Sequence, residues 1–110
     1  MRPDQTYLYD ILHASRSALE FVKNLSEEGF RASALHQSAV IRQLEIIGEA
    51  AKKVSEKTRA AHTEIAWKKM AGLRDVLIHA YDTVDIKMVW RLLKDDIPQL
   101  ITELEGIMTE

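Results

Sequence analysis

The segment AVIRQLEIIGEAAK, residues 39–52, determines the fold class, because its apolar side chains recur at helical spacing and do not alternate as in a strand. Extended to residue 54, its main stripe consists of Val40, Leu44, Ile47, Ala51 and Val54. Ile41 and Ile46 widen this stripe, so we expect the helix to be central and covered on more than one side. Ser33 lies upstream and is a suitable cap for its N-terminus.

A first helix is predicted upstream of this central one. It starts at Asp4, which is a plausible N-cap, and its apolar stripe ends near Leu25. Gly29 is expected to supply the left-handed conformation that terminates the segment. Downstream of the central helix, residues 55–65 lack clear periodicity and indicate a polar, basic connection.

Two more helices are predicted in the C-terminal half. One spans residues 67–81, and the other spans residues 85–107 with Asp85 as its N-cap. Pro98 should kink or interrupt the last helix near Ile97, because proline has no amide proton to donate. Four principal helices with short connections indicate an all-α, antiparallel up-and-down bundle of four to five helices.

The composition excludes several classes of protein. The chain has 110 residues, so residues 1–110 are expected to form a single domain. It contains no cysteine, which excludes a disulfide framework and a thiolate zinc site. No apolar run is long enough to span a membrane, and no signal-peptide core follows the start. We therefore expect a soluble cytoplasmic protein with no membrane partner.

The charge is unevenly distributed along the chain. The net charge of -2 argues mildly against a dedicated nucleic-acid binder. Between Lys52 and Arg74, however, there are seven basic and two acidic residues, whereas residues 95–110 hold five acidic residues and no basic one. The basic region could attract phosphates. The alternative is that both charge runs are solvated helix faces.

The segment RDVLIHAY, residues 74–81, combines Arg74, His79 and Tyr81 within an otherwise apolar helical pattern. On a helix, Arg74 and His79 lie roughly 140° apart around the axis and about 7.5 Å apart along it, so only the long arginine side chain lets both reach one target. Asp75 is four residues before His79 and could accept a ring N–H, which would fix the imidazole tautomer. Tyr81 could stack on a base or be a chemical target.

These residue types suit RNA cleavage. His79 could take the proton from a 2′-hydroxyl, and Arg74 could stabilise the charge that develops on the phosphoryl oxygens. One such set lacks a separate acid for the leaving oxygen, which a second copy across a twofold axis would supply. The alternative is that Arg74 and His79 are ordinary polar residues at a helix edge.

Other chemistry-bearing residues have less specific patterns. His13, His36 and His62 show no metal-ligand spacing, so no metal site is expected. Trp67 and Trp90 occupy apolar helical positions and are predicted to be core or dimer contacts rather than base-stacking platforms.

Three blocks in order resemble the HepT-like branch of the HEPN superfamily. Residues 39–52 resemble the second-helix signature of that branch, and IAWKKMAGLRDVLIHAY, residues 65–81, resembles its active-site helix. Residues 84–100, which include Val84-Asp85, Val89-Trp90 and Asp96-Ile97-Pro98-Gln99-Leu100, resemble its final helix. The resemblance covers residues 39–104 closely and the first helix loosely.

The resemblance implies a fold, an activity and partners. It implies a dimeric all-α bundle in which the R-x4-H residues of both subunits, here Arg74 and His79, line one cleft. The family members are metal-independent endoribonuclease toxins of type VII toxin–antitoxin systems, which need no cofactor. Their antitoxin is a minimal nucleotidyltransferase, with which a hetero-oligomer is possible. In some pairs the antitoxin adds AMP to the motif tyrosine, here Tyr81.

One residue departs from the family pattern. Many members have asparagine directly after the arginine, where this chain has Asp75. A carboxylate there would make the cleft less attractive to phosphate and would favour the charged imidazole of His79. A second hypothesis therefore stays open: a non-catalytic helical module that binds a nucleotidyltransferase partner or a nucleotide.

Overall fold

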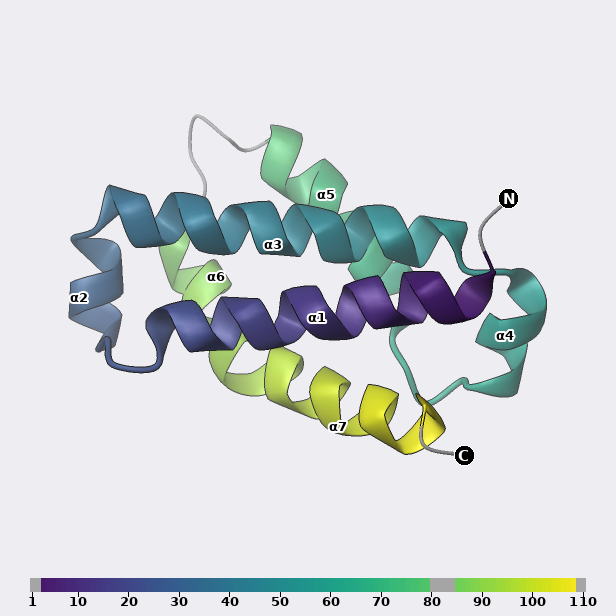
Figure 1. Ribbon diagram of the computed structural model, residues 1–110. Coiled ribbons are helices and arrows are strands. Elements are labelled where there is room, and N and C mark those ends of the chain that lie inside the picture. Colours follow the sequence, from purple (N-terminus) through teal and green to yellow (C-terminus); the bar gives the residue numbers. More distant parts are fainter. Residues whose placement is uncertain (1–2, 80–84, 109–110) are drawn as a thin grey trace.

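The computed structural model describes residues 3–79 and 85–108, apart from the side chains at positions 74, 75, 76, 78 and 79. This part of the chain is all-α (Figure 1). The elements are α1 (Asp4–Val22), α2 (Glu27–Arg31), α3 (Ala34–Lys53), α4 (Glu56–Ala61), α5 (Trp67–His79), α6 (Ile86–Arg91), the π-helix η1 (Leu92–Asp96) and α7 (Ile97–Met108). The predicted all-α bundle is confirmed.

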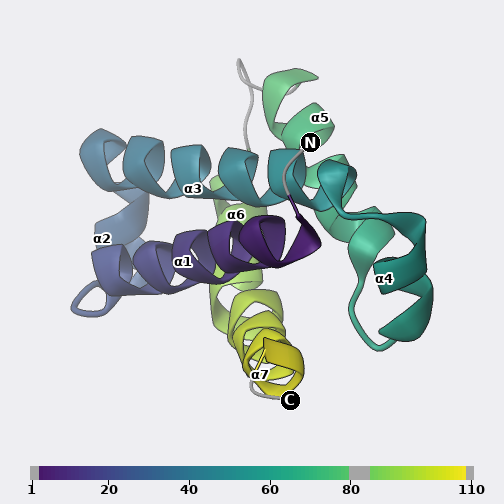
Figure 2. The same cartoon turned by 45° about the vertical axis from the view of Figure 1, so that its right-hand side comes forward.

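Helix α3 is the centre of the bundle. It packs against α1 on one side and α5 on another, while α7 packs against α1 (Figures 1 and 2). Each member of the predicted stripe of α3 is at most 2% exposed: Val40, Leu44, Ile47, Ala51 and Val54. The prediction of a central helix that is covered on more than one side is therefore confirmed. Burial of this stripe is the main favourable contribution that α3 makes to folding.

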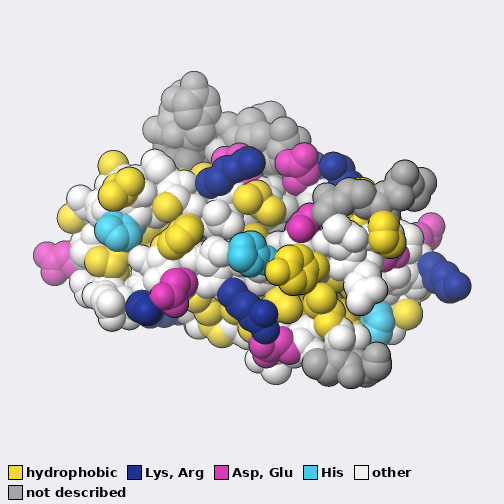
Figure 3. All heavy atoms as spheres, in the orientation of Figure 1, with side chains coloured by type: hydrophobic (Ala, Val, Ile, Leu, Met, Phe, Trp, Pro, Cys, Tyr) yellow, Lys and Arg dark blue, Asp and Glu magenta, His cyan; other side chains and the backbone are white. Residues whose placement is uncertain are grey.

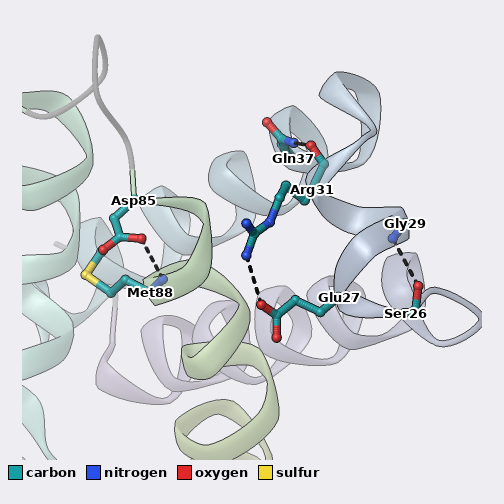
Figure 4. Close-up of polar contacts among 7 residues, drawn as sticks. All are labelled: Ser26, Glu27, Gly29, Arg31, Gln37, Asp85 and Met88. Carbon is teal, nitrogen blue, oxygen red and sulfur yellow. Dashed lines mark hydrogen bonds and ion pairs between the residues drawn. The ribbon is translucent and has the colours of Figure 1, made fainter.

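Serine and aspartate side chains cap four of the described helices, namely α2, α3, α4 and α6. The predicted caps are confirmed: Ser33 accepts a hydrogen bond from the His36 backbone N–H, and Asp85 accepts one from that of Met88. Ser26 caps α2 in the same way, with the Gly29 N–H as donor (Figure 4). Each cap satisfies one backbone donor that the first turn of a helix leaves unpaired.

The prediction for Gly29 is wrong. Helix α1 ends at Val22, and Gly29 lies inside α2. In the described part of the chain, no glycine has a positive φ, so Gly29 does not adopt the left-handed conformation. The N-cap Ser26 starts a new helix of five residues before the chain turns into α3. Glycine is therefore an interior residue of this short helix, and the ion pair between Glu27 and Arg31 at 3.1 Å spans it (Figure 4).

The prediction that Asp4 caps α1 is also wrong. Pro3 occupies the N-cap position of α1 and makes no side-chain cap. The Asp4 carboxylate instead accepts hydrogen bonds from the Ser55 backbone N–H at 3.0 Å and from the Thr58 hydroxyl at 2.5 Å, and a further one from the Ser55 hydroxyl. Ser55 is itself the cap of α4, a short helix within the predicted connection. Asp4 thus ties the start of α1 to the start of α4.

Removing the Asp4 carboxylate should give a pH-dependent loss of stability. Hydrogen bonds from Ser55 and Thr58 hold the pKa of Asp4 below its ordinary value. The ionised group therefore stabilises the fold above its unfolded pKa near 4, and this contribution is lost as the pH falls through the lower folded pKa. Asp4→Ala is expected to lower the melting temperature at neutral pH, by an amount that shrinks as the solution is acidified. An equal decrease at every pH would show that ionisation of Asp4 does not matter.

The interruption predicted near Ile97 is a π-helical turn. Residues Leu92–Asp96 form η1, and the Ile97 N–H bonds to the Leu92 carbonyl five residues back. Pro98 follows as the second residue of α7, and it has no amide proton to donate to a carbonyl of the preceding turn. The wider turn lets the chain pass from α6 to α7 without a loop.

No helix in the described ranges 3–79 and 85–108 has the length and apolarity needed to cross a membrane.

Candidate functional site

Helix α5 carries the positions of the predicted catalytic residues. It begins at Trp67, whose indole Nε1–H donates to the His62 carbonyl at 2.9 Å. Trp67, Leu73 and Leu77 are buried, and with Met70 they attach α5 to α3. The buried stripe fixes the rotation of α5 about its own axis, and therefore fixes where its remaining backbone positions lie.

Positions 74 and 79 are placed differently with respect to this stripe. Measured around the helix axis from Leu73, the stripe runs through Leu77 at roughly 40° and Met70 at roughly 60° to Trp67 at roughly 120°. Backbone position 74, at roughly 100°, therefore lies within the angular range of the stripe, whereas position 79, at roughly 240°, lies on the opposite side of the helix. The side chains of Arg74, Asp75 and His79 lie outside the described part of the structure, as does all of Tyr81. Their convergence stays a prediction.

A groove lies beside α5. It has a volume of about 580 Å³, and α5 forms one wall while α6 and η1 form the other. The residues that line it are Lys68, Lys69, Gly72, Leu73, Met88, Arg91, Leu92, Asp95 and Asp96. A smaller hollow of about 190 Å³ continues from it toward α7. This groove was not predicted from the sequence, although Gly72 in the middle of a predicted helix leaves one position of the helix surface without a side chain.

One ion pair bridges the two walls of the groove. Lys69 Nζ lies 2.6 Å from the Asp96 carboxylate, and both side chains are exposed. An exposed pair of this kind contributes little to stability, about 0–1 kcal/mol. Its structural consequence is the pairing of the first turn of α5 with the last residue of η1.

The predicted basic region between Lys52 and Arg74 is only partly free to attract phosphate. Lys69 pairs with Asp96, and Lys53 lies 3.9 Å from Glu49. On the face shown in Figure 3, basic and acidic side chains are interspersed among apolar ones. The alternative of solvated helix faces therefore describes part of this charge run.

The other histidines have local partners. His36 Nδ1 lies 2.6 Å from the Ser33 hydroxyl, His13 stacks on Tyr9 with ring centroids 6.0 Å apart, and His62 lies 3.6 Å from Glu64. Within the part of the chain that the structure describes, no group of three or more His, Asp or Glu side chains could hold a metal ion.

The tryptophans belong to the core, as predicted. Trp67 and Trp90 are both buried. Trp90 packs against Phe30 with ring centroids 5.4 Å apart, and Lys94 Nζ lies 4.6 Å from the centroid of its ring. Trp90 therefore joins α2 to the α6–η1 segment. Because Trp67 and Trp90 are both buried, neither ring forms a platform on which bases could stack.

Similarity to known proteins defines the class. The Ribonuclease HepT-like family matches residues 11–107, a range that contains all of α3 and α5. The chain belongs to this HepT-like family of the HEPN superfamily.

Among particular proteins, the chain is 43% identical over 106 residues to one named "Probable ribonuclease HepT" from Thermococcus cleftensis, and the match covers 96% of each chain. It is 38% identical over 104 residues to "Putative RNase MJ1380" from Methanocaldococcus jannaschii, covering 94% of this chain and 95% of the relative. A third relative from the latter organism, "Gamma-glutamylcyclotransferase and putative RNase MJ0434", is 41% identical over 111 residues, which are 50% of its length. No solved structure matches the chain.

Proposed function

We propose that this chain is a metal-independent endoribonuclease whose catalytic residues are Arg74 and His79. The observation that carries the proposal is the family match over residues 11–107, together with the R-x4-H spacing on the helix that packs against the central α3. The names of two nearly full-length relatives describe ribonucleases. Helix α5 supplies what such a site needs, since buried side chains anchor it and hold its backbone in place.

The chemistry requires a base, an acid and a cation. His79 removes the proton from a 2′-hydroxyl, and the resulting oxygen attacks the adjacent phosphorus. The bond from phosphorus to the 5′-oxygen breaks, which leaves a 2′,3′-cyclic phosphate and a 5′-hydroxyl after that oxygen takes up a proton. Arg74 stabilises the negative charge on the phosphoryl oxygens, and Asp75 orients the imidazole of His79.

The proton for the leaving oxygen points to a homodimer. A single chain offers one imidazole in the R-x4-H motif, whereas two copies about a twofold axis bring two imidazoles and two guanidinium groups to one cleft. In this arrangement the His79 of one subunit acts as base while the partner subunit's His79 protonates the 5′-oxygen.

The products of RNA cleavage test the reaction directly. Purified protein is expected to cut a single-stranded RNA in the presence of EDTA and to leave 2′,3′-cyclic phosphate ends. An otherwise identical oligonucleotide with 2′-deoxy sugars should stay intact, because it lacks the attacking hydroxyl. Cleavage of the deoxy substrate, or activity that disappears with EDTA, would contradict this mechanism. An intact RNA in both arms would favour the non-catalytic module.

The proposed biological setting is a type VII toxin–antitoxin pair in the cytoplasm. In this setting the endoribonuclease is the toxin, and a minimal nucleotidyltransferase is the antitoxin that binds it as a hetero-oligomer. Tyr81 is two residues from His79, so an AMP group on Tyr81 would place a phosphate beside the catalytic imidazole. The added negative charge would repel the phosphates of incoming RNA.

Modification of Tyr81 should silence the nuclease. After incubation with the nucleotidyltransferase and ATP, the peptide that contains Tyr81 is expected to gain the mass of one or more AMP units, and RNA cleavage should fall at least about tenfold. Tyr81→Phe should remain active under the same treatment, since it lacks the acceptor hydroxyl. Silencing of the Tyr81→Phe protein together with an unmodified wild-type peptide would show that the partner inhibits without this modification.

A further inference from the structure

The groove beside α5 combines an apolar floor with charged edges. Leu73 from α5 and Met88 and Leu92 from the α6–η1 segment supply the apolar surface. Lys68 and Arg91 are exposed at its edges, and among the described residues neither is paired with a carboxylate. A nucleotide has the complementary chemistry, because its base is flat and largely apolar on its faces while its phosphate is anionic.

The groove leads toward the C-terminal half of α5. Because α6 and η1 return antiparallel to α5 (Figure 1), the Lys69–Asp96 pair fixes which residues face one another across the groove. Arg91 precedes Asp96 by five residues and therefore lies further toward positions 74 and 79 of α5. A strand that occupies the groove would thus have a phosphate near Arg91 on its way to position 79, whose backbone lies at about the same angle around α5 as Lys68 and Gly72.

Gly72 leaves space on the α5 side of the groove, because it has no side chain. A Cβ built on Gly72 would meet no atom within 4 Å, so the glycine is not required for close packing within the chain. Glycine in the interior of a helix costs about 0.5–1 kcal/mol relative to alanine. Room for a ligand at the groove wall gives this unfavourable residue a role.

We propose that this groove is a nucleotide subsite of the RNA-binding surface, in which Arg91 contacts the phosphate next to the scissile bond and the base lies on Leu73, Met88 and Leu92. The proposal rests on the ribonuclease function proposed above and assigns substrate-positioning roles to Arg91 and Gly72. Lys68 contacts a more distant phosphate. Asp95 also lines the groove and would repel a phosphate, but its carboxylate can accept a hydrogen bond from an exocyclic amino group of a base.

A nucleotide fits the groove better than a protein segment does. Lys68 and Arg91 lie at the edges of the groove without a carboxylate partner among the described residues, and the phosphate of a nucleotide supplies the negative charge that complements them. Its volume of about 580 Å³ lies within the range of small-ligand sites, about 300–1,000 Å³. Self-association through the groove is the competing outcome of the tests below.

The charge test compares two arginine or lysine truncations. Arg91→Ala is expected to raise the KM for a single-stranded RNA about tenfold with a smaller change in kcat, and to lower the slope of log binding constant against log salt by about 1. Arg91→Lys should restore most of the salt slope. Lys57→Ala is the matched control, because it removes an exposed cation on α4 that does not line the groove. Equal KM and salt slope for wild type, Arg91→Ala and Lys57→Ala would overturn the proposal.

The shape test fills the groove without removing a charge. Gly72→Met should weaken RNA binding about tenfold, while Gly72→Ala should bind RNA normally and melt at a higher temperature. Gly106→Met is the matched control, since its Cβ also meets nothing within 4 Å and Gly106 lies on α7 away from the groove. Normal RNA binding by Gly72→Met, with or without a change in oligomeric state by sedimentation, would overturn the proposal.

The proposed subsite and the proposed nuclease activity can be tested separately. Anisotropy of a labelled RNA measures binding in the His79→Ala background, where no cleavage is expected. If Arg91→Ala and Gly72→Met weaken that binding but wild-type protein cuts no RNA, then the subsite stands and the nuclease function fails. If wild-type protein cuts RNA and both variants bind and cut normally, then the nuclease stands and the subsite fails.

Discussion

His79→Ala is expected to reduce RNA cleavage in EDTA at least about 10³-fold, because the variant has neither the base that activates the 2′-hydroxyl nor the partner subunit's acid. The helix itself should persist, since buried residues such as Leu73 and Leu77 attach α5 to α3. Rates of cleavage of a labelled RNA, measured together with circular dichroism and sedimentation, check this expectation.

His13→Ala is the matched control for this variant. His13 is exposed on α1 and stacks on Tyr9, so its loss should leave cleavage within about twofold of wild type. Wild-type rates for folded His79→Ala protein would remove His79 from the mechanism. A large decrease in both variants would indicate that histidine replacement acts through something other than the proposed base.

Phe30→Ala is expected to destabilise the fold by about 3–5 kcal/mol, the usual range for deleting a buried phenylalanine side chain. Phe30 is 0% exposed and stacks at a tilt of 35° against Trp90, so its truncation would leave a cavity between α2 and α6. For a domain of this size, the melting temperature should fall by at least about 10 °C. Thermal and urea unfolding followed by circular dichroism measure the change.

Phe21→Ala controls for the loss of an aromatic side chain. Phe21 is 40% exposed at the end of α1, so its truncation removes less buried surface and should cost about 1 kcal/mol or less. Similar destabilisation by the two variants would contradict the packing described around Phe30 and Trp90.

The periodic apolar patterns were sufficient to predict the long helices. Stripes such as Val40, Leu44 and Ile47 are dictated by burial, and burial is encoded locally in the spacing of the residues. Ser33 and Asp85 could be predicted as caps for a similar reason, because each accepts from a backbone N–H only three residues away.

Short helices and long-range contacts were not predictable in this way. Asp4 had the residue type of an N-cap, but its carboxylate bonds to Ser55 and Thr58, more than fifty residues away. Gly29 had the residue type of a helix stop, but the cap Ser26 starts a new helix around it. In both cases tertiary contacts or a neighbouring cap decided the outcome, and neither effect has a periodic signal.

The candidate site was predictable only in part, for the same reason. Spacing predicted that positions 74 and 79 lie on one helix, and α5 confirms this for the backbone. The groove depends on the return of α6 and η1 beside α5, a relation between segments about twenty residues apart that no local pattern encodes. Its amphipathic lining could be recognised only once both walls were known.

The most direct test of the central claim is the cleavage rate in EDTA of four proteins: wild type, Arg74→Ala, His79→Ala and the double variant. If Arg74 and His79 act together on one phosphate, each single replacement should remove most of the activity, and the double variant should be little slower than the slower single one. Multiplying effects in the double variant, or wild-type rates for either single variant, would contradict a shared catalytic site.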